Sequence, residues 1–311
     1  MILLDTVSDD LTGRMSLIQE ILDGHRTDTP RPLFGDAEKD VVETLRKFGK
    51  DVFYDFLRRE DPADLDRATL IFRASVVLCL LDHALRPQVL GGLGYALCHR
   101  ERWSRPEGEH HEKGEGQRLL QKAAQLSVPG TPYHLNCLDR LSHQHFFLFQ
   151  QTGASDEIAE AIWLQEEALA YRPDGHPGRV NSVGNLAVLF LFKLQVLGII
   201  EDLEHAIQYS REALRITPEP GQERIKYLDS LANGVLVRFR LAGNASDLDE
   251  AINLYEESLE QPFTGKKTVA QSGLGSALML RFEQTSHKND LDRGIELLRD
   301  SLIQKPEGNP A

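Results

Sequence analysis

The sequence predicts an all-α protein built as an α-solenoid, in which pairs of antiparallel helices stack one on the next. Two observations carry this prediction: one helical pattern recurs at nearly constant spacing, and a second recurs between its copies. Two amphipathic helices per unit cannot bury their apolar faces alone, so successive units must stack. The fold class therefore follows from the repeat and not from any single motif.

The first pattern is clearest in four segments of the carboxyl-terminal half. A small residue is followed by isoleucine, a second small residue comes seven positions later, and leucine and then proline follow. Apolar residues at i, i+3, i+7 and i+8 are typical of an amphipathic helix, and proline prevents the helix from continuing. The small residues recur at intervals of 45, 45 and 43 residues, at Ala161, Ala206, Ala251 and Gly294, and the prolines are Pro173, Pro218, Pro262 and Pro306.

The second pattern lies between these helices and begins with a leucine next to a small residue. Its copies are Leu93-Gly94, Leu186-Ala187, Leu231-Ala232 and Leu274-Gly275. The glycine-rich "GGLG" at 91–94 lies inside such a helix, so we expect it to serve close packing and not phosphate binding.

The order of Leu-Gly, Ala, an aromatic residue, a second small residue and Pro resembles the tetratricopeptide repeat (TPR), in the long-unit form common in fungal multi-repeat proteins. The signature of the first helix is matched by Leu274-Gly275, and that of the second by Ala251, Tyr255, Ser258 and Pro262. The resemblance implies a right-handed α-solenoid of stacked antiparallel helix pairs. The unit here is longer than the roughly 34 residues of the family, which implies longer helices.

The resemblance is clearest over 156–306 and weaker over 63–155. In the weaker part some positions keep the spacing, namely Ala68, Ser75, Ala124 and Pro129, whereas Gln117 and Gln125 break it. Residues 1–62 are expected to form N-terminal helices, at about 9–23 and 36–60, that cap the solenoid, and residues 63–311 its repeats. An end unit exposes an apolar face, which is why a cap is needed.

The helix expected at 290–304 has a broad apolar surface and no following partner helix. It carries Ile295, Leu297, Leu298, Leu302 and Ile303. Either the chain associates with itself through this helix, or it is a piece of a longer protein with a missing domain. The second interpretation is favoured, because these repeats usually flank other domains in the family that the chain resembles.

Composition restricts the classes of partner and compartment. The net charge of −13 argues against a general role with nucleic acid or at a membrane surface. Cys79, Cys98 and Cys137 are widely spaced and odd in number, which favours free thiols in a reducing compartment and hence a cytoplasmic location. The most apolar run, Leu186–Ile200, is shorter than the roughly 18 to 20 residues that cross a bilayer, so we expect a buried helix.

The sequence offers no sign of catalysis, a metal or a cofactor. The pair His110-His111 lies in a polar loop (102–116) without a third ligand at suitable spacing. On a helix, His143 and His145 point about 200° apart and cannot hold one ion together. No nucleophile elbow, protease cysteine signature or H-E-x-x-H is found. The chain is therefore expected not to be an enzyme.

The stretch "SDLDEAINLYEESLE" (246–260) is the segment that looks most like a site, because it holds six carboxylates in fifteen residues. We expect Ser246 or Asp247 to cap a helix and the other acids to wet its outer face. At positions equivalent to Glu256 the other copies have Arg211 and Arg299, which a metal site could not tolerate. This segment is a copy of the repeat.

A binding role is expected instead at the first helix of each pair, which lines the concave side in the family that the chain resembles. The candidate partner-binding residues are Asn185, Asn233, Lys193, Arg238 and Arg281. Asparagine can pair with a ligand's backbone amides. The three cations occupy one equivalent position and would form a basic row. Alternatively their stems pack while their heads reach water, and that interpretation is favoured.

The predicted function is a non-catalytic protein–protein interaction scaffold that binds a peptide or protein partner on the concave face. Electrostatics favour a partner whose surface is net basic, with an acidic group meeting the basic row. An alternative is a repeat region that regulates a signalling, nucleotide-binding or caspase-like protease domain of a longer protein. An enzyme with a pocket that no motif reveals is the least favoured hypothesis.

Overall fold

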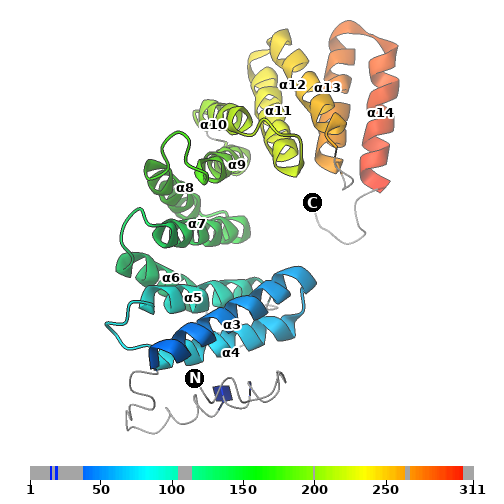
Figure 1. Ribbon diagram of the computed structural model, residues 1–311. Coiled ribbons are helices and arrows are strands. Elements are labelled where there is room, and N and C mark those ends of the chain that lie inside the picture. Colours follow the sequence, from blue (N-terminus) through cyan, green and yellow to red (C-terminus); the bar gives the residue numbers. More distant parts are fainter. Residues whose placement is uncertain are drawn as a thin grey trace. The chain divides into compact units, whose positions relative to one another are not determined.

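The computed structural model describes residues 15, 18–19, 38–103, 114–198, 200–262 and 267–303. Within these ranges it contains helices and no strand (Figure 1). The long helices are α3 (Glu38–Arg59), α4 (Pro62–Leu78), α5 (Arg86–Trp103), α6 (Glu115–Leu126), α7 (Pro132–Thr152), α8 (Ser155–Ala170), α9 (Arg179–Leu197), α10 (Asp202–Ile216), α11 (Gln222–Ala242), α12 (Ala245–Glu260), α13 (Thr268–Thr285) and α14 (Lys288–Ile303). The chain divides into two compact units, 1–145 and 146–311, which are described separately.

In the unit 146–311 the helices pack as consecutive pairs. Helix α9 packs with α10, α11 with α12, and α13 with α14, while α10 also packs on α11 and α12 on α13. The first helices of successive pairs contact one another as well, α9 with α11 and α11 with α13. The predicted all-α fold of stacked helix pairs is therefore confirmed.

The small residues of the repeat lie where two backbones approach. A Cβ atom on Gly275 of α13 would come within 3.0 Å of the Gly294 carbonyl oxygen of α14. At the equivalent crossings in the two preceding pairs, Ala206 and Ala251 are fully buried. A larger side chain at these positions would push the paired helices apart.

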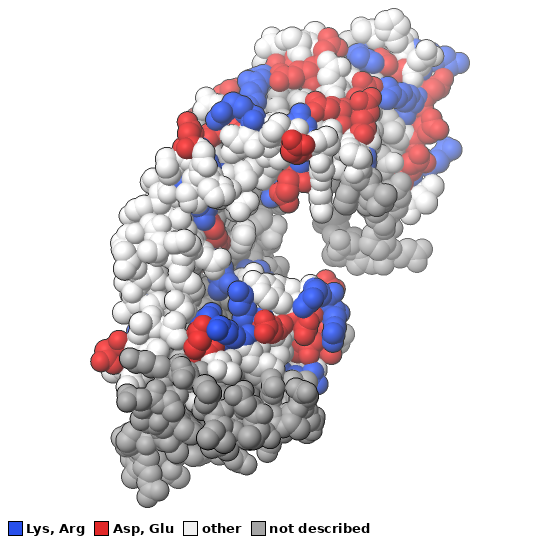
Figure 2. Space-filling view, viewed as in Figure 1, with Lys and Arg blue, Asp and Glu red and all other residues white. Residues whose placement is uncertain are grey.

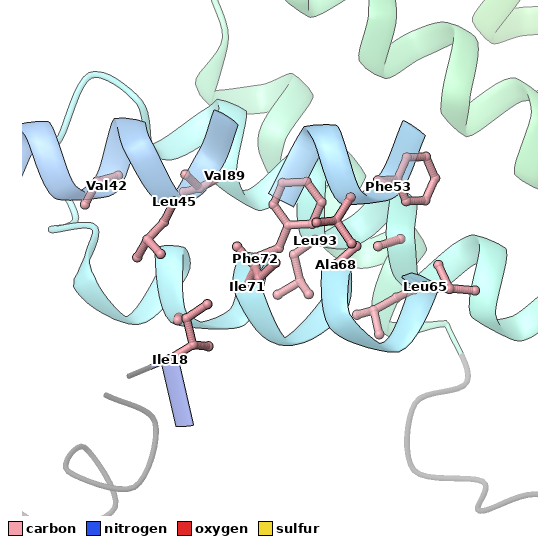
Figure 3. Packing of buried hydrophobic residues seen from close by; sticks show 14 of the residues in the cluster. Ile18, Val42, Leu45, Phe53, Leu65, Ala68, Ile71, Phe72, Val89 and Leu93 are labelled. Atoms are coloured by element: carbon pink, nitrogen blue, oxygen red, sulfur yellow. The ribbon is translucent and has the colours of Figure 1, made fainter. Parts of the chain in front are cut away.

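In the unit 1–145, α3 packs with α4, α4 with α5, and α5 with α6. Figure 3 shows side chains of α3 and α4 meeting in a shared core, with Val89 and Leu93 of α5 and with Ile18 from the N-terminal segment. Helix α3 also contacts α5, as α9 contacts α11. The expected boundary at residue 62 falls at the start of α4, between two helices that pack as a pair, and the division into cap and repeats stays a prediction.

Helix α6 keeps the repeat spacing one residue earlier than the sequence suggested. Its buried small pair is Gly116 and Ala123, seven residues apart, where Gln117 and Ala124 had been aligned. A Cβ atom on Gly116 would come within 2.7 Å of the Gly94 carbonyl oxygen, which is the same kind of crossing as that of Gly275 and Gly294. The weak match in this part came from a shifted register and not from a different packing.

Most of the apolar run expected at 186–200 lies in helix α9, which begins earlier, at Arg179, and ends at Leu197. Helix α9 has 19 residues and, by length and composition alone, could cross a membrane, which no other helix among the described residues could. The length argument from the sequence was therefore wrong. Core helices of soluble proteins pass the same test, and Leu186, Leu189 and Phe190 of α9 pack with side chains of α8 and α10.

Some expected features lie outside the described residues. These are most of the helix at about 9–23, apart from Met15, Ile18 and Gln19, the pair His110-His111, and Pro306.

Candidate functional site

The first helices of the pairs in the unit 146–311 share one partly exposed stripe, which we call the A-helix face. Its five positions per helix are spaced four, three, four and three residues apart, so they lie on one side of each helix. Every residue at these positions is half-buried or exposed. They are Asn181, Asn185, Val188, Phe192 and Gln195 on α9; Lys226, Ser230, Asn233, Val237 and Arg240 on α11; and Val269, Gly273, Ser276, Leu280 and Glu283 on α13.

The A-helix face has chemically distinct rows across the three helices. One row is apolar and half-buried, and consists of Phe192, Val237 and Leu280. Beside it are rows of short side chains, among which the Ser230 and Ser276 hydroxyls donate to carbonyls of their own helices. Each hydroxyl oxygen keeps lone pairs for a further donor. The face thus offers apolar contact next to hydrogen-bonding groups.

Both candidate asparagines lie on this face, but in different rows. Asn185 comes directly before the signature leucine of α9, and Asn233 comes two residues after that of α11. The Asn233 Oδ1 accepts a hydrogen bond of 2.6 Å from the Tyr255 hydroxyl of α12, so part of its capacity is used inside the protein. The two candidate asparagines therefore do not form one row across the helices.

The three candidate cations lie beside the A-helix face, each in an ion pair with an aspartate nine residues later. The pairs are Lys193 with Asp202 at 3.0 Å, Arg238 with Asp247 at 3.0 Å, and Arg281 with Asp290 at 2.8 Å. In each pair the cation stands near the end of the first helix and the aspartate in the first turn of the second. The pairs therefore join the two helices of one repeat unit across their turn.

The guanidinium pairs are reinforced by a second acid and change the proton affinity of both partners. Arg238 also reaches Glu204 of the preceding pair at 3.4 Å. The hydrogen bonds that Arg238 donates to Asp247 raise the pKa of Arg238, and those from Arg281 hold the pKa of Asp290 below its usual value. Since each aspartate is buried, removing its cation would leave a charge without compensation.

A further set of basic residues binds the carboxyl end of the preceding helix, and the sequence analysis did not identify it. Arg179 and Arg224 each donate to a carbonyl seven residues earlier and bind a glutamate 33 residues later, Glu212 at 2.7 Å and Glu257 at 2.6 Å. Lys267 likewise donates to carbonyls at the end of α12. A cation at a helix carboxyl end is favoured by the helix dipole. The signal was present as a basic residue seven positions before each signature leucine.

The acidic stretch of α12 forms an ion-pair hub, and its carboxylates are not simply exposed. Five of its six carboxylates lie within 4.0 Å of five different arginines: Asp247 with Arg238, Asp249 with Arg281, Glu250 with Arg211, Glu256 with Arg293, and Glu257 with Arg224. Figure 2 shows acidic and basic side chains interspersed over this part of the molecule. The expected capping residues were wrong, because α12 begins at Ala245 and Asp247 is a buried partner of Arg238.

In the unit 1–145 the corresponding side of α5 is aromatic. The His99 ring makes edge-on contacts with Phe53, Tyr95 and Phe56, and the Arg140 guanidinium lies 4.1 Å from the centre of the Tyr95 ring. Burial, followed by the charges of nearby arginines, lowers the pKa of His99 to about 4. This histidine is neutral at physiological pH and acts as part of an aromatic cluster.

The remaining candidate groups for chemistry are accounted for by packing. Cys79, Cys98 and Cys137 are buried and form no disulfide, and burial raises the pKa of the Cys98 thiol to about 12. His145 contacts the Gln117 amide at 3.0 Å. In the part of the chain that the structure describes, no group of three or more His, Cys, Asp or Glu side chains is placed to hold a metal ion.

Known structures share this architecture at low sequence identity. A crystal structure of a Podosopora anserina protein described as a kinesin light chain, with nearly identical TPR-like repeats, is similar at a TM-score of 0.50 and 13% identity, covering 73% of this chain and 99% of that one. A second crystal structure of that protein gives a TM-score of 0.46 and 14% identity over 75% of this chain. No family model and no curated protein sequence matches the chain. The fold is therefore a TPR-like helical repeat.

Proposed function

We propose that the chain is a non-catalytic scaffold that binds an extended peptide, or an extended segment of a protein, across the A-helix face of residues 146–311. The TPR-like repeat fold supports a role in protein–protein interaction in general. The observation that supports this particular face is its apolar row, Phe192, Val237 and Leu280, which three adjacent helices hold half-exposed next to short polar side chains.

The spacing of that row suggests the conformation of the partner. Packed helices lie about 8 to 10 Å apart. A polyproline II segment advances about 3.1 Å per residue with three residues per turn, so every third side chain lies on one side, about 9 Å from the last. A partner with apolar residues at i, i+3 and i+6 would therefore place one side chain against each of α9, α11 and α13.

Short polar side chains on the face suit the backbone of such a peptide. A polyproline II segment has no internal hydrogen bonds, so its carbonyl and N–H groups need partners when they are covered. The Ser276 oxygen lies in the row next to the apolar one, and the Asn185 amide and the Ser230 oxygen lie one row further along the same side of their helices. They would meet backbone groups while the apolar row takes the side chains.

The three cations would contribute to binding only if the partner displaced the aspartates that they already bind. Lys193, Arg238 and Arg281 each hold an aspartate of their own unit, so an acidic group of the partner would have to compete with it. We infer that these cations mainly fix the helix pairs that carry the face. The net charge of −13 favours a partner with a net basic surface.

The non-catalytic part of the proposal is supported by how the charged groups are used. Several acids and arginines of the repeats pair between helices, among them Glu250 with Arg211, Glu257 with Arg224 and Glu256 with Arg293, and the thiols are buried. Three buried cysteines that form no disulfide also fit a cytoplasmic location, where thiols stay reduced.

Peptide selection on the full chain tests the proposal. Peptides selected from a random displayed library should carry apolar residues three apart and should bind in solution. Ser230→Arg, in the middle of the face, should abolish binding, whereas Asn253→Arg, which adds the same side chain on the exposed side of α12, should leave it unchanged. If both variants bind the peptides equally well, the face is not the binding site.

A further inference from the structure

Helix α14 leaves in solvent an apolar side chain that its counterparts bury. Ile295 is 45% exposed, whereas Ile207 of α10 and Ile252 of α12, at the equivalent positions, are 1% and 2% exposed. Leu302 is 67% exposed, whereas the equivalent Leu214 and Leu259 are partly buried. In the other repeat units, the equivalent surface of the second helix is therefore covered by the next helix pair.

In α10 this surface is covered by the next helix pair, α11 and α12, which we call its cover. A Cβ atom on Gly234 of α11 would come within 3.1 Å of the Ile207 side chain. Glu204 of α10 pairs with Arg238 of α11 at 3.4 Å. Arg211 of α10 pairs with Glu250 of α12 at 2.9 Å. The contact therefore combines a small residue over isoleucine with two ion pairs of opposite polarity.

The surface of α14 repeats the chemistry of α10. Asp292, Ile295 and Arg299 stand at the spacing of Glu204, Ile207 and Arg211, with the same sign of charge at each end. Helix α12 differs, because it has Glu256 at the third position, and its cover α13–α14 supplies Arg293 there. The polarity of α14 therefore matches the cover α11–α12 and not the cover α13–α14.

We propose that the surface formed by Asp292, Ile295, Arg299 and Leu302, the α14 docking surface, binds a helix pair of this repeat type. Its first helix has a glycine or alanine over Ile295 and a basic residue that meets Asp292. Its second helix has an acidic residue that meets Arg299. The interface continues the stacking already present between α10 and α11 and between α12 and α13.

A second copy of the chain through α14 is the main competing occupant. Contact of α14 with α14 would set two isoleucine side chains against each other, whereas the internal covers present the small residues Gly234 or Ala277 at that place. The net charge of −13 also opposes association of two copies. Both points favour the helix pair.

The test uses the full chain and a labelled peptide of residues 222–260, which carries Gly234, Arg238 and Glu250. The probe is used in a form crosslinked between its two helices, and its circular dichroism verifies that it is helical before it binds. Fluorescence anisotropy should show binding, and Ile295→Asp should weaken it about tenfold or more, because the buried isoleucine is lost. Asn253→Arg, far from α14 in the sequence and exposed on α12, is the matched surface control.

Charge exchange makes the test specific. Arg299→Glu should weaken binding of the probe about three- to fivefold, and a probe with Glu250→Arg should recover it. Absence of binding by the crosslinked probe, or binding that ignores Ile295→Asp, would overturn the proposal. Sedimentation of the full chain as a dimer that Ile295→Asp dissociates would do so as well, because the occupant would then be a second copy.

Discussion

A close contact between one repeat and the next, that of Tyr255 with Gly273, gives a decisive stability prediction. The ring of Tyr255, on α12, is fully buried and lies against Gly273 of α13. A Cβ atom on Gly273 would come within 2.6 Å of the tyrosine oxygen and closer still to two ring carbons. Contacts between such atoms are favourable only near 3.5 to 4.0 Å, so the ring would have to move by about 1 Å.

Two opposing effects set the size of the change for Gly273→Ala. Replacing glycine by alanine inside a helix normally stabilises it by about 1 kcal/mol. Here overpacking costs about 1 to 3 kcal/mol, and displacement of the ring loses the hydrogen bond from Tyr255 to Asn233, about 1 kcal/mol. The variant should therefore lower the free energy of unfolding by about 1 to 3 kcal/mol.

The repeat suggests the control background. At the position equivalent to Tyr255 the preceding unit has Ser210, and at the position equivalent to Gly273 it has Ser230. In the Tyr255→Ser background the clash is absent, so Gly273→Ala should become stabilising by up to about 1 kcal/mol. Urea denaturation followed by circular dichroism measures all four proteins. A stabilising effect of Gly273→Ala in the original chain, or equal effects in both backgrounds, would refute this account of the contact.

Three further predictions concern charged groups. Burial raises the pKa of Asp229 to about 6, so the folded state loses stability as pH rises through 6. Asp229→Asn should therefore raise the free energy of unfolding at pH 7.5 by up to about 3 kcal/mol and remove that pH dependence. Thermal melts at pH 4.5 to 7.5 would show both effects. Burial lowers the pKa of His99, so stability that is present above pH 6.5 is lost as pH falls towards 4. His99→Phe should make the melting temperature depend less on pH over that range. An unchanged pH dependence of the melting temperature would contradict the lowered pKa of His99. Arg238→Asp should lower the free energy of unfolding by about 2 to 4 kcal/mol, because Asp247 is then buried beside a like charge. Adding Asp247→Arg should restore most of the lost stability, as measured by urea denaturation.

The fold could be predicted from the sequence because the repeat fixes side chains that face the core. Positions such as Ala251 and Ile252 must be small and apolar wherever a helix pair is packed, so they recur at constant spacing. In α6 the glycine that allows the close crossing lies one residue from where the alignment expected it, which is why that copy looked weak. Packing constrains residue size more strongly than residue identity.

The charged groups were harder to interpret from sequence. The acids of α12 looked like a solvated helix face, because a single helix does not show which arginine of another helix stands opposite. Their partners lie on α10, α11, α13 and α14, and only the stacking brings them together. The nine-residue interval from Arg238 to Asp247 recurs in the neighbouring units and was the available clue.

The proposed function requires a partner that lies across the A-helix face, and photo-crosslinking can locate that partner. A photoreactive amino acid placed at Val237, in the apolar row of α11, should form a covalent adduct with a selected peptide, and the same group at Asn253 on α12 should form none. Adducts at Asn253 without adducts at Val237 would place the partner on the second helices and contradict the proposed function.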